Sequence, residues 1–230
     1  MSTTSILARL NAFHIVVPVT TVVFALSFKA GGLGPIGLVV GAVAGLGWSL
    51  LLGFVTQRLN RQASLRYKLE DLLVFLAIVG TAFLYVGGVM YGLLFSAALN
   101  EPSTSPQVLS ALMQPTIPYY IIVNTSMEAL VVPALLYVGW RAGKRRTIIV
   151  AAALLYYGMR IWTYLVWAEA RVDLAAGPLS ARDIDRFKEL MDNDRDILLV
   201  PMFALFIIAA FVPAWHRDRQ AALPTNALTR

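Results

Sequence analysis

The sequence contains no cysteine and only two histidines, His14 and His216, among its 230 residues. The lack of cysteine excludes disulfides, thiolate metal sites, iron–sulfur clusters and cysteine nucleophiles. Two histidines near opposite ends of the chain cannot assemble a histidine-rich haem, di-iron or zinc site. We therefore expect no metal and no cofactor.

Charged residues are also scarce, at 14% of the chain against about 25% in a typical soluble domain. Hydrophobic residues make up 58%, and the mean hydropathy is +0.69. This composition is typical of membrane proteins. No long polar stretch could form a second domain, so residues 1–230 are expected to form one transmembrane domain. The net charge of +6 does not indicate nucleic acid, because the basic residues flank apolar segments.

Six apolar segments are long enough to cross a bilayer as helices, which takes about 20 residues at about 1.5 Å each. They predict an all-α fold, a bundle of six transmembrane helices. The apolar runs are continuous and lack the alternation typical of strands. Their approximate limits are residues 11–28, 34–56, 70–97, 116–140, 147–168 and 196–215.

The distribution of basic residues predicts the orientation of this bundle. With both termini in the cytoplasm, twelve of the nineteen lysines and arginines lie inside and six lie outside. Because positive residues concentrate in short cytoplasmic loops, we expect both termini to be inside, at the plasma (inner) membrane. The outer loop between the fifth and sixth spans is rich in acids. Within it, residues 180–191 predict a short amphipathic helix on the membrane or on the bundle mouth.

Glycines repeat along the second predicted span, where Gly37, Gly41 and Gly45 lie four residues apart. Such a stripe lets the backbones of two helices approach closely. We expect the stripe to pack within the chain; contact with a second copy or a partner subunit is the alternative. Prolines inside three spans, Pro133 among them, are expected to kink the helices or to widen the bundle locally.

Acidic residues stand at the start of the third predicted span, where Glu70 and Asp71 follow a basic loop. Carboxylates at a helix N-terminus complement the helix dipole. We therefore expect these two residues to stabilise the first turn of that helix.

The strongest functional signal is a pair of charged residues inside two predicted spans, Glu128 and Arg160. A short basic loop joins the fourth and fifth spans, so these helices form an antiparallel hairpin. Counted from that loop at about 1.5 Å per residue, the two residues lie about 18 and 21 Å deep, near the middle of the bilayer. An isolated charge there costs at least about 2.5 kcal/mol, so each residue is the natural partner of the other.

Polar and aromatic residues follow the same faces of these two helices, at spacings of three and four. Together they predict a substrate pocket that is mostly aromatic, with a few convergent polar groups. The alternative is an ion pair that only fixes the register of the hairpin. The expected lining residues are Tyr120, Asn124, Tyr156, Tyr164, Trp167 and, near the outer mouth, Glu169.

Three functions fit these features. The first is a membrane enzyme that acts without metal on a small lipophilic substrate, by acid/base chemistry of the cyclase or isomerase type, with Glu128 and Arg160 as catalytic residues. The second is a substrate-binding subunit or small transporter, in which Arg160 binds an anionic group. The third is a structural subunit of a membrane complex. The lack of an evident ion pathway or inverted repeat favours the enzyme.

Overall fold

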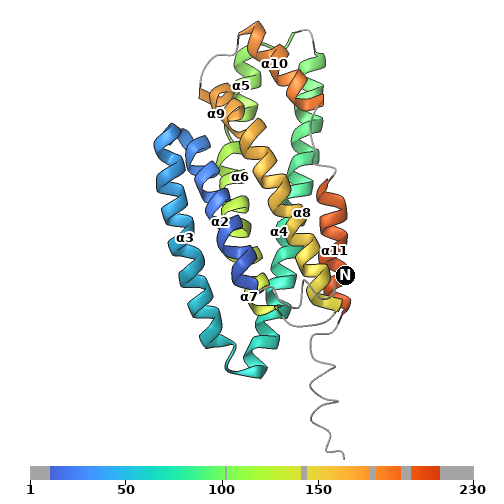
Figure 1. Cartoon of the computed structure of the whole chain (residues 1–230). Helices are drawn as coiled ribbons and strands as arrows, with labels where there is room; N and C mark the ends of the chain where they lie inside the picture. Colours follow the sequence, from blue (N-terminus) through green and yellow to red (C-terminus); the bar gives the residue numbers. More distant parts are fainter. Residues whose placement is uncertain (1–10, 102, 141–143, 177–179, 193–197, 213–230) are drawn as a thin grey trace, which may run out of the picture.

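The computed structural model describes residues 11–101, 103–140, 144–176, 180–192 and 198–212. These residues form helices and no strand, which confirms the predicted all-α fold for this part of the chain. Figure 1 shows the long helices packed side by side as a bundle. The helices in chain order are α2 (Ala12–Phe28), η1 (Lys29–Leu33), α3 (Gly34–Leu59), α4 (Ala63–Asn100), α5 (Pro106–Met113), α6 (Thr116–Thr125), η2 (Ser126–Val131), α7 (Val132–Val138), α8 (Lys144–Val166), α9 (Ala168–Ala176), α10 (Ala181–Asp192) and α11 (Leu199–Phe211).

Four helical stretches are long and apolar enough to cross a membrane: Ala12–Leu59, Ser64–Asn100, Pro106–Val138 and Lys144–Val166. The first of them reverses direction in the π-turn η1, where Gly32 has a φ of 98°. Glycine reaches this conformation readily because it has no Cβ. As a result α2 and α3 lie side by side as a hairpin (Figure 1). The apolar helix α11 is shorter, and the ends of the sixth predicted span lie outside the described residues.

Large apolar side chains cover the outward face of this hairpin. Ile36, Val39 and Val43 of α3 are 71%, 67% and 68% exposed, and their spacing places them on one side of the helix. Phe75 and Leu93 are similarly exposed on α4. Soluble monomers rarely expose apolar surfaces of this extent, whereas a helix in contact with lipid does so by necessity. The surface is consistent with a membrane location.

The glycine stripe lies on the opposite face of α3 and packs against α2 within the same chain. A Cβ at Gly41 would lie 2.4 Å from the carbonyl oxygen of Phe24, and one at Gly45 would lie 2.8 Å from that of Thr20. A Cβ at Gly37 would meet backbone atoms at 2.7 Å. A second copy of the chain could use this stripe only if α2 moved away from it.

The prediction that Glu70 and Asp71 stabilise the first turn of a helix was wrong. Helix α4 begins at Ala63, about two turns earlier, and has no acid in its first turn. Both carboxylates instead contact the buried guanidinium of Arg145, at the start of α8. The two acids therefore form ion pairs with a residue of another helix and do not stabilise the first turn of their own.

The helix predicted at residues 180–191 is confirmed as α10. The backbone N–H of Ser180 donates to the carboxylate of Asp183 at 2.9 Å, and the N–H of Asp183 donates to the hydroxyl oxygen of Ser180 at 3.3 Å. Hydrogen bonds from Ser180 hold the pKa of Asp183 below its usual value. Ile184 packs onto a small apolar cluster that includes Trp167, so α10 covers this end of the bundle.

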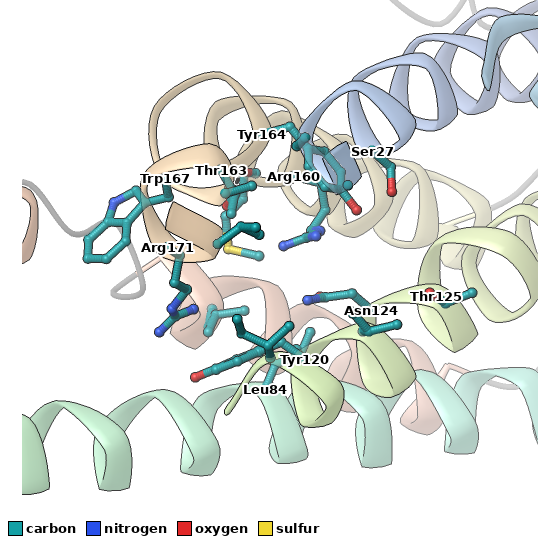
Figure 2. A pocket seen from close by; sticks show the side chains of 18 residues that line it. Ser27, Leu84, Tyr120, Asn124, Thr125, Arg160, Thr163, Tyr164, Trp167 and Arg171 are labelled. Atoms are coloured by element: carbon teal, nitrogen blue, oxygen red, sulfur yellow. Dashed lines mark hydrogen bonds between the residues drawn. The ribbon is translucent and has the colours of Figure 1, made fainter. Parts of the chain in front are cut away.

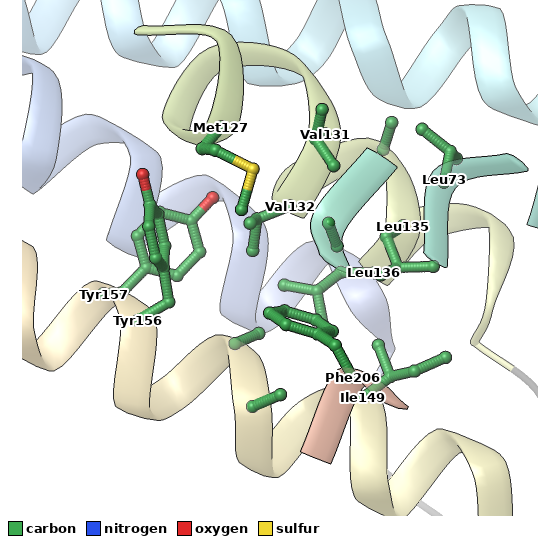
Figure 3. Close-up of a cluster of buried hydrophobic side chains, with 14 of the residues drawn as sticks. Leu73, Met127, Val131, Val132, Leu135, Leu136, Ile149, Tyr156, Tyr157 and Phe206 are labelled. Atoms are coloured by element: carbon green, nitrogen blue, oxygen red, sulfur yellow. The ribbon is translucent and has the colours of Figure 1, made fainter. Parts of the chain in front are cut away.

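A larger apolar core lies between α2, α4, η2, α7, α8 and α11. Its centre contains the side chains of Met127, Leu135, Ile149, Tyr157 and Phe206 (Figure 3). The two apolar clusters leave a cavity between them.

Candidate functional site

The cavity has a volume of about 290 Å³ and is lined by residues from α2, η1, α4, α6, α8, α9 and α11. Five of the residues that the sequence predicted for the pocket or its catalytic centre lie in its wall. They are Tyr120, Asn124, Arg160, Tyr164 and Trp167. The volume is close to the lower end of the range of about 300–1,000 Å³ typical of small-molecule sites.

The predicted pair of charges does meet. The guanidinium Nε of Arg160 donates to Oε1 of Glu128, and both residues are buried. The hydroxyl of Tyr164 donates to Oε2 of the same carboxylate at 2.8 Å. Its ring also lies 4.6 Å from the guanidinium carbon of Arg160. Glu128 therefore has one cationic and one neutral donor, which is how a buried carboxylate becomes tolerable in an apolar environment.

Glu128 lies in η2, a π-turn that interrupts the fourth predicted span. Pro133 explains the irregular hydrogen bonding, because proline has no N–H to donate to the carbonyl four residues earlier, that of Ala129. The indole N–H of Trp48, on α3, donates to that carbonyl instead. The carbonyl of Glu128 lies 3.4 Å from the hydroxyl of Tyr157, on α8. Two neighbouring helices thus hold the turn from which Glu128 reaches Arg160, and π-turns are frequent at functional sites.

Two guanidinium groups and one amide face the cavity. Figure 2 shows the ends of Arg160, Asn124 and Arg171 turned toward the same space. Glu128 is not part of the lining, because Arg160 and Tyr164 stand between its carboxylate and the cavity. Among the side chains that the structure describes, no carboxylate lines this space. The cavity therefore offers hydrogen-bond donors and positive charge to whatever occupies it.

Arg171, on α9, also lines the cavity but was not among the residues predicted from the sequence. Its guanidinium carbon lies 4.6 Å from the ring of Tyr120, 4.8 Å from Tyr91 and 5.6 Å from Trp167. These distances are typical of cation–π contacts. Its position four residues after Trp167 was a usable signal, since that spacing continues the face of Arg160, Tyr164 and Trp167 by one turn.

Two of the predicted lining residues are not found in the cavity wall. One lies in the core, and the side chain of the other is outside the described part of the structure. Tyr156 is fully buried in the core behind the cavity, with its hydroxyl 3.5 Å from the carbonyl oxygen of Asn124. It supports the cavity wall from behind. Glu169 belongs to α9, but its side chain lies outside the part of the structure that is described. The roles of both in substrate binding stay predictions.

No protein-family model, curated protein or solved structure matches this chain.

The bond from Trp48 to the π-turn leads to a stability prediction. We expect Trp48→Phe to lower the free energy of unfolding by about 1–3 kcal/mol, because the carbonyl of Ala129 loses its donor in an apolar environment. Denaturation of the purified protein in detergent would measure the loss. Trp162→Phe is the control, since it trims a tryptophan of α8 outside the π-turn. Equal losses in the two variants would show that ring size alone matters.

Proposed function

We propose that the chain is an integral membrane protein of six spans, with both termini on the cytoplasmic side of the plasma (inner) membrane. The four apolar stretches support membrane insertion, and the hairpin of α2 and α3 accounts for two spans within one stretch. The junction of α3 and α4 carries Arg58, Arg61 and Arg66, and the start of α8 carries Arg145 and Arg146. Both regions lie at one end of the bundle (Figure 1). The acid-bearing helix α10 lies at the other end. This arrangement supports the basic end as the cytoplasmic one.

We further propose that the protein binds a small lipophilic anion, as a binding subunit or a small transporter. The observation that carries this proposal is the composition of the cavity wall: two guanidinium groups and an amide face it, and no described carboxylate lines it. A guanidinium binds a carboxylate or phosphate through two parallel hydrogen bonds. The apolar and aromatic remainder of the wall suits the lipophilic part of such a ligand.

Within this proposal the two arginines have different tasks. Arg160 is charge-balanced by Glu128 and held by Tyr164, so it presents N–H groups in a fixed orientation. Arg171 is surrounded by rings rather than by described carboxylates, so its charge attracts the anion. Glu128 acts as a positioning residue for Arg160.

The proposal predicts that Arg171→Gln weakens anion binding at least tenfold, which corresponds to about 1.4 kcal/mol. A brominated fatty acid serves as the probe, because bromine quenches the fluorescence of nearby tryptophan and Trp167 lines the cavity. Quenching titrations of the purified protein give the dissociation constant. Trp167→Phe should remove most of the quenching and so locate the probe.

Two controls make this test specific for charge at the cavity. The methyl ester of the same fatty acid should bind much more weakly than the acid to the natural protein. Arg58→Gln also removes a guanidinium that lies over a ring, that of Phe54 at 4.9 Å, but far from the cavity. Its dissociation constant should be unchanged. Equal binding of acid and ester would refute an anion site. Mass spectrometry of molecules that copurify with the protein would identify the natural ligand.

The membrane enzyme stays the second candidate, because one contact favours it. Tyr164 lines the cavity and also contacts the carboxylate of Glu128, so its hydroxyl could pass a proton between Glu128 and a substrate. In an enzyme of this kind, Glu128→Gln would abolish chemical conversion of the copurified molecule while its binding persists. In a binding protein the molecule would leave the natural protein unchanged.

A further inference from the structure

A second cavity lies toward the basic end of the bundle, between residues 71–78 of α4, the start of α8 and the end of α11. Its volume is about 200 Å³. Its polar wall consists of Asp71 and Arg145, and its other described lining residues are apolar. None of its lining residues belongs to the cavity around Arg160.

The polar wall presents two opposite charges side by side. The Nη2 of Arg145 donates to Oδ1 of Asp71 at 2.7 Å, and its Nε lies 3.2 Å from Oε1 of Glu70. Arg145 and Glu70 are buried, whereas the side chain of Asp71 is 55% exposed. Nη2 is engaged by Asp71, whereas Nε is buried and has no hydrogen-bond partner among the described residues, so the guanidinium keeps donor capacity for a further acceptor. Arg66, one turn before Glu70 on α4, supplies the second positive charge near Glu70.

The apolar wall continues from these charges toward the middle of the bundle. Phe75 and Ile78 follow Asp71 at spacings of four and three, so they lie on the same face of α4. Phe211 of α11 lines the other side and is 82% exposed. In the proposed orientation, the charged end of this cavity lies at the cytoplasmic membrane boundary, where lipid head groups are found.

We propose that this cavity binds a zwitterionic aminophospholipid, with its primary ammonium at Asp71, its phosphate at Arg145 and an acyl chain along Phe75 and Ile78. A primary ammonium can donate hydrogen bonds to a carboxylate, whereas the quaternary ammonium of a choline lipid cannot. An anionic lipid would satisfy Arg145 but would be repelled by Asp71. Basic pockets between transmembrane helices on the cytoplasmic side bind lipid head groups, and Asp71 adds a partner for an ammonium to the basic group here. The site rests on the proposed membrane orientation and not on the anion cavity, so failure of either binding test leaves the other unaffected.

The test is retention of lipid by the full-length protein. The protein is reconstituted with equal amounts of phosphatidylethanolamine, phosphatidylcholine and phosphatidylglycerol of identical acyl chains, then released from detergent and weighed by native mass spectrometry. We expect phosphatidylethanolamine to be retained at least fivefold over each of the other two. Asp71→Asn should abolish its preference over phosphatidylcholine, because the amide carries no charge for the ammonium.

Two further variants separate lipid binding from folding. Glu101→Gln removes a carboxylate at the other end of α4 and should leave the lipid preference unchanged. Ala210→Trp fills the cavity from α11 and leaves both members of the ion pair in the chain, so it should lower retention even if Asp71→Asn does not fold. Retention of all three lipids alike, a preference for phosphatidylglycerol, or undiminished retention in Ala210→Trp would each overturn the proposal.

Discussion

Arg160→Met is expected to lower the free energy of unfolding by about 3–5 kcal/mol, and adding Glu128→Gln to restore most of that loss. The single change leaves a carboxylate buried with one hydroxyl donor, and removing one partner of a buried pair has a cost of this order. The double variant replaces both charges with neutral groups of similar size. Such replacements are often neutral or stabilising. Denaturant titration of the two single variants and the double variant gives the coupling energy directly.

The same variants separate the structural alternative from the binding proposal. If the pair only fixes the register of the hairpin, the double variant will be stable and will bind the brominated fatty acid as the natural protein does. If Arg160 binds the anion, the double variant will be stable but its dissociation constant will rise at least tenfold. If the losses in unfolding free energy of the two single variants simply add in the double variant, Glu128 and Arg160 do not stabilise each other. Both the structural alternative and the binding proposal would then be contradicted.

The charged pair could be predicted from the sequence because the prediction depends only on regular helix geometry. A short loop and a rise of about 1.5 Å per residue suffice to bring Glu128 and Arg160 to one depth. The limits of α2, α3 and α8 also follow from apolar length and agree with the predicted segments within a few residues. These features depend on residues that are close together in the sequence. They can therefore be predicted without knowing how the helices pack.

Features that depend on packing could not be predicted. The π-turn η2 changes the side-chain directions that a regular helix would give, and its carbonyls find donors on α3 and α8, far away in the sequence. Tyr156 was predicted to line the pocket because it shares a helical face with Arg160, but the close contact between α8 and the core buries it. Glu70 and Asp71 suggested a helix start because their partner Arg145 is distant in sequence.

Gly41→Ala is expected to be the most damaging single-methyl change in the hairpin of α2 and α3. The added Cβ would lie 2.4 Å from the carbonyl oxygen of Phe24 and 2.7 Å from the Cα of Ala25. Both are backbone atoms, so no rotamer change can relieve the contact and the helices must separate. Overpacking costs about 1–3 kcal/mol, and we expect a loss at the upper end of this range. Thermal or denaturant unfolding in detergent measures it.

Gly47→Ala is the matched control, on the same helix and with the same added methyl. A Cβ at Gly47 meets nothing within 4 Å. Because alanine favours the helix over glycine by about 0.5–1 kcal/mol, this variant should be slightly more stable than the natural protein. The two alanine variants are therefore expected to change stability in opposite directions.

The oligomeric state of the Gly41→Ala variant then tests the remaining role for the glycine stripe. If a second copy packed against these glycines, the variant would dissociate into monomers of undiminished stability. If α2 occupies the stripe, the monomer itself loses stability. Separation of α2 and α3 should also disturb the anion cavity, because Ser27 at the end of α2 and Gly31 of η1 line it. Weaker binding of the brominated fatty acid by Gly41→Ala, but not by Gly47→Ala, would link the helix packing to the site.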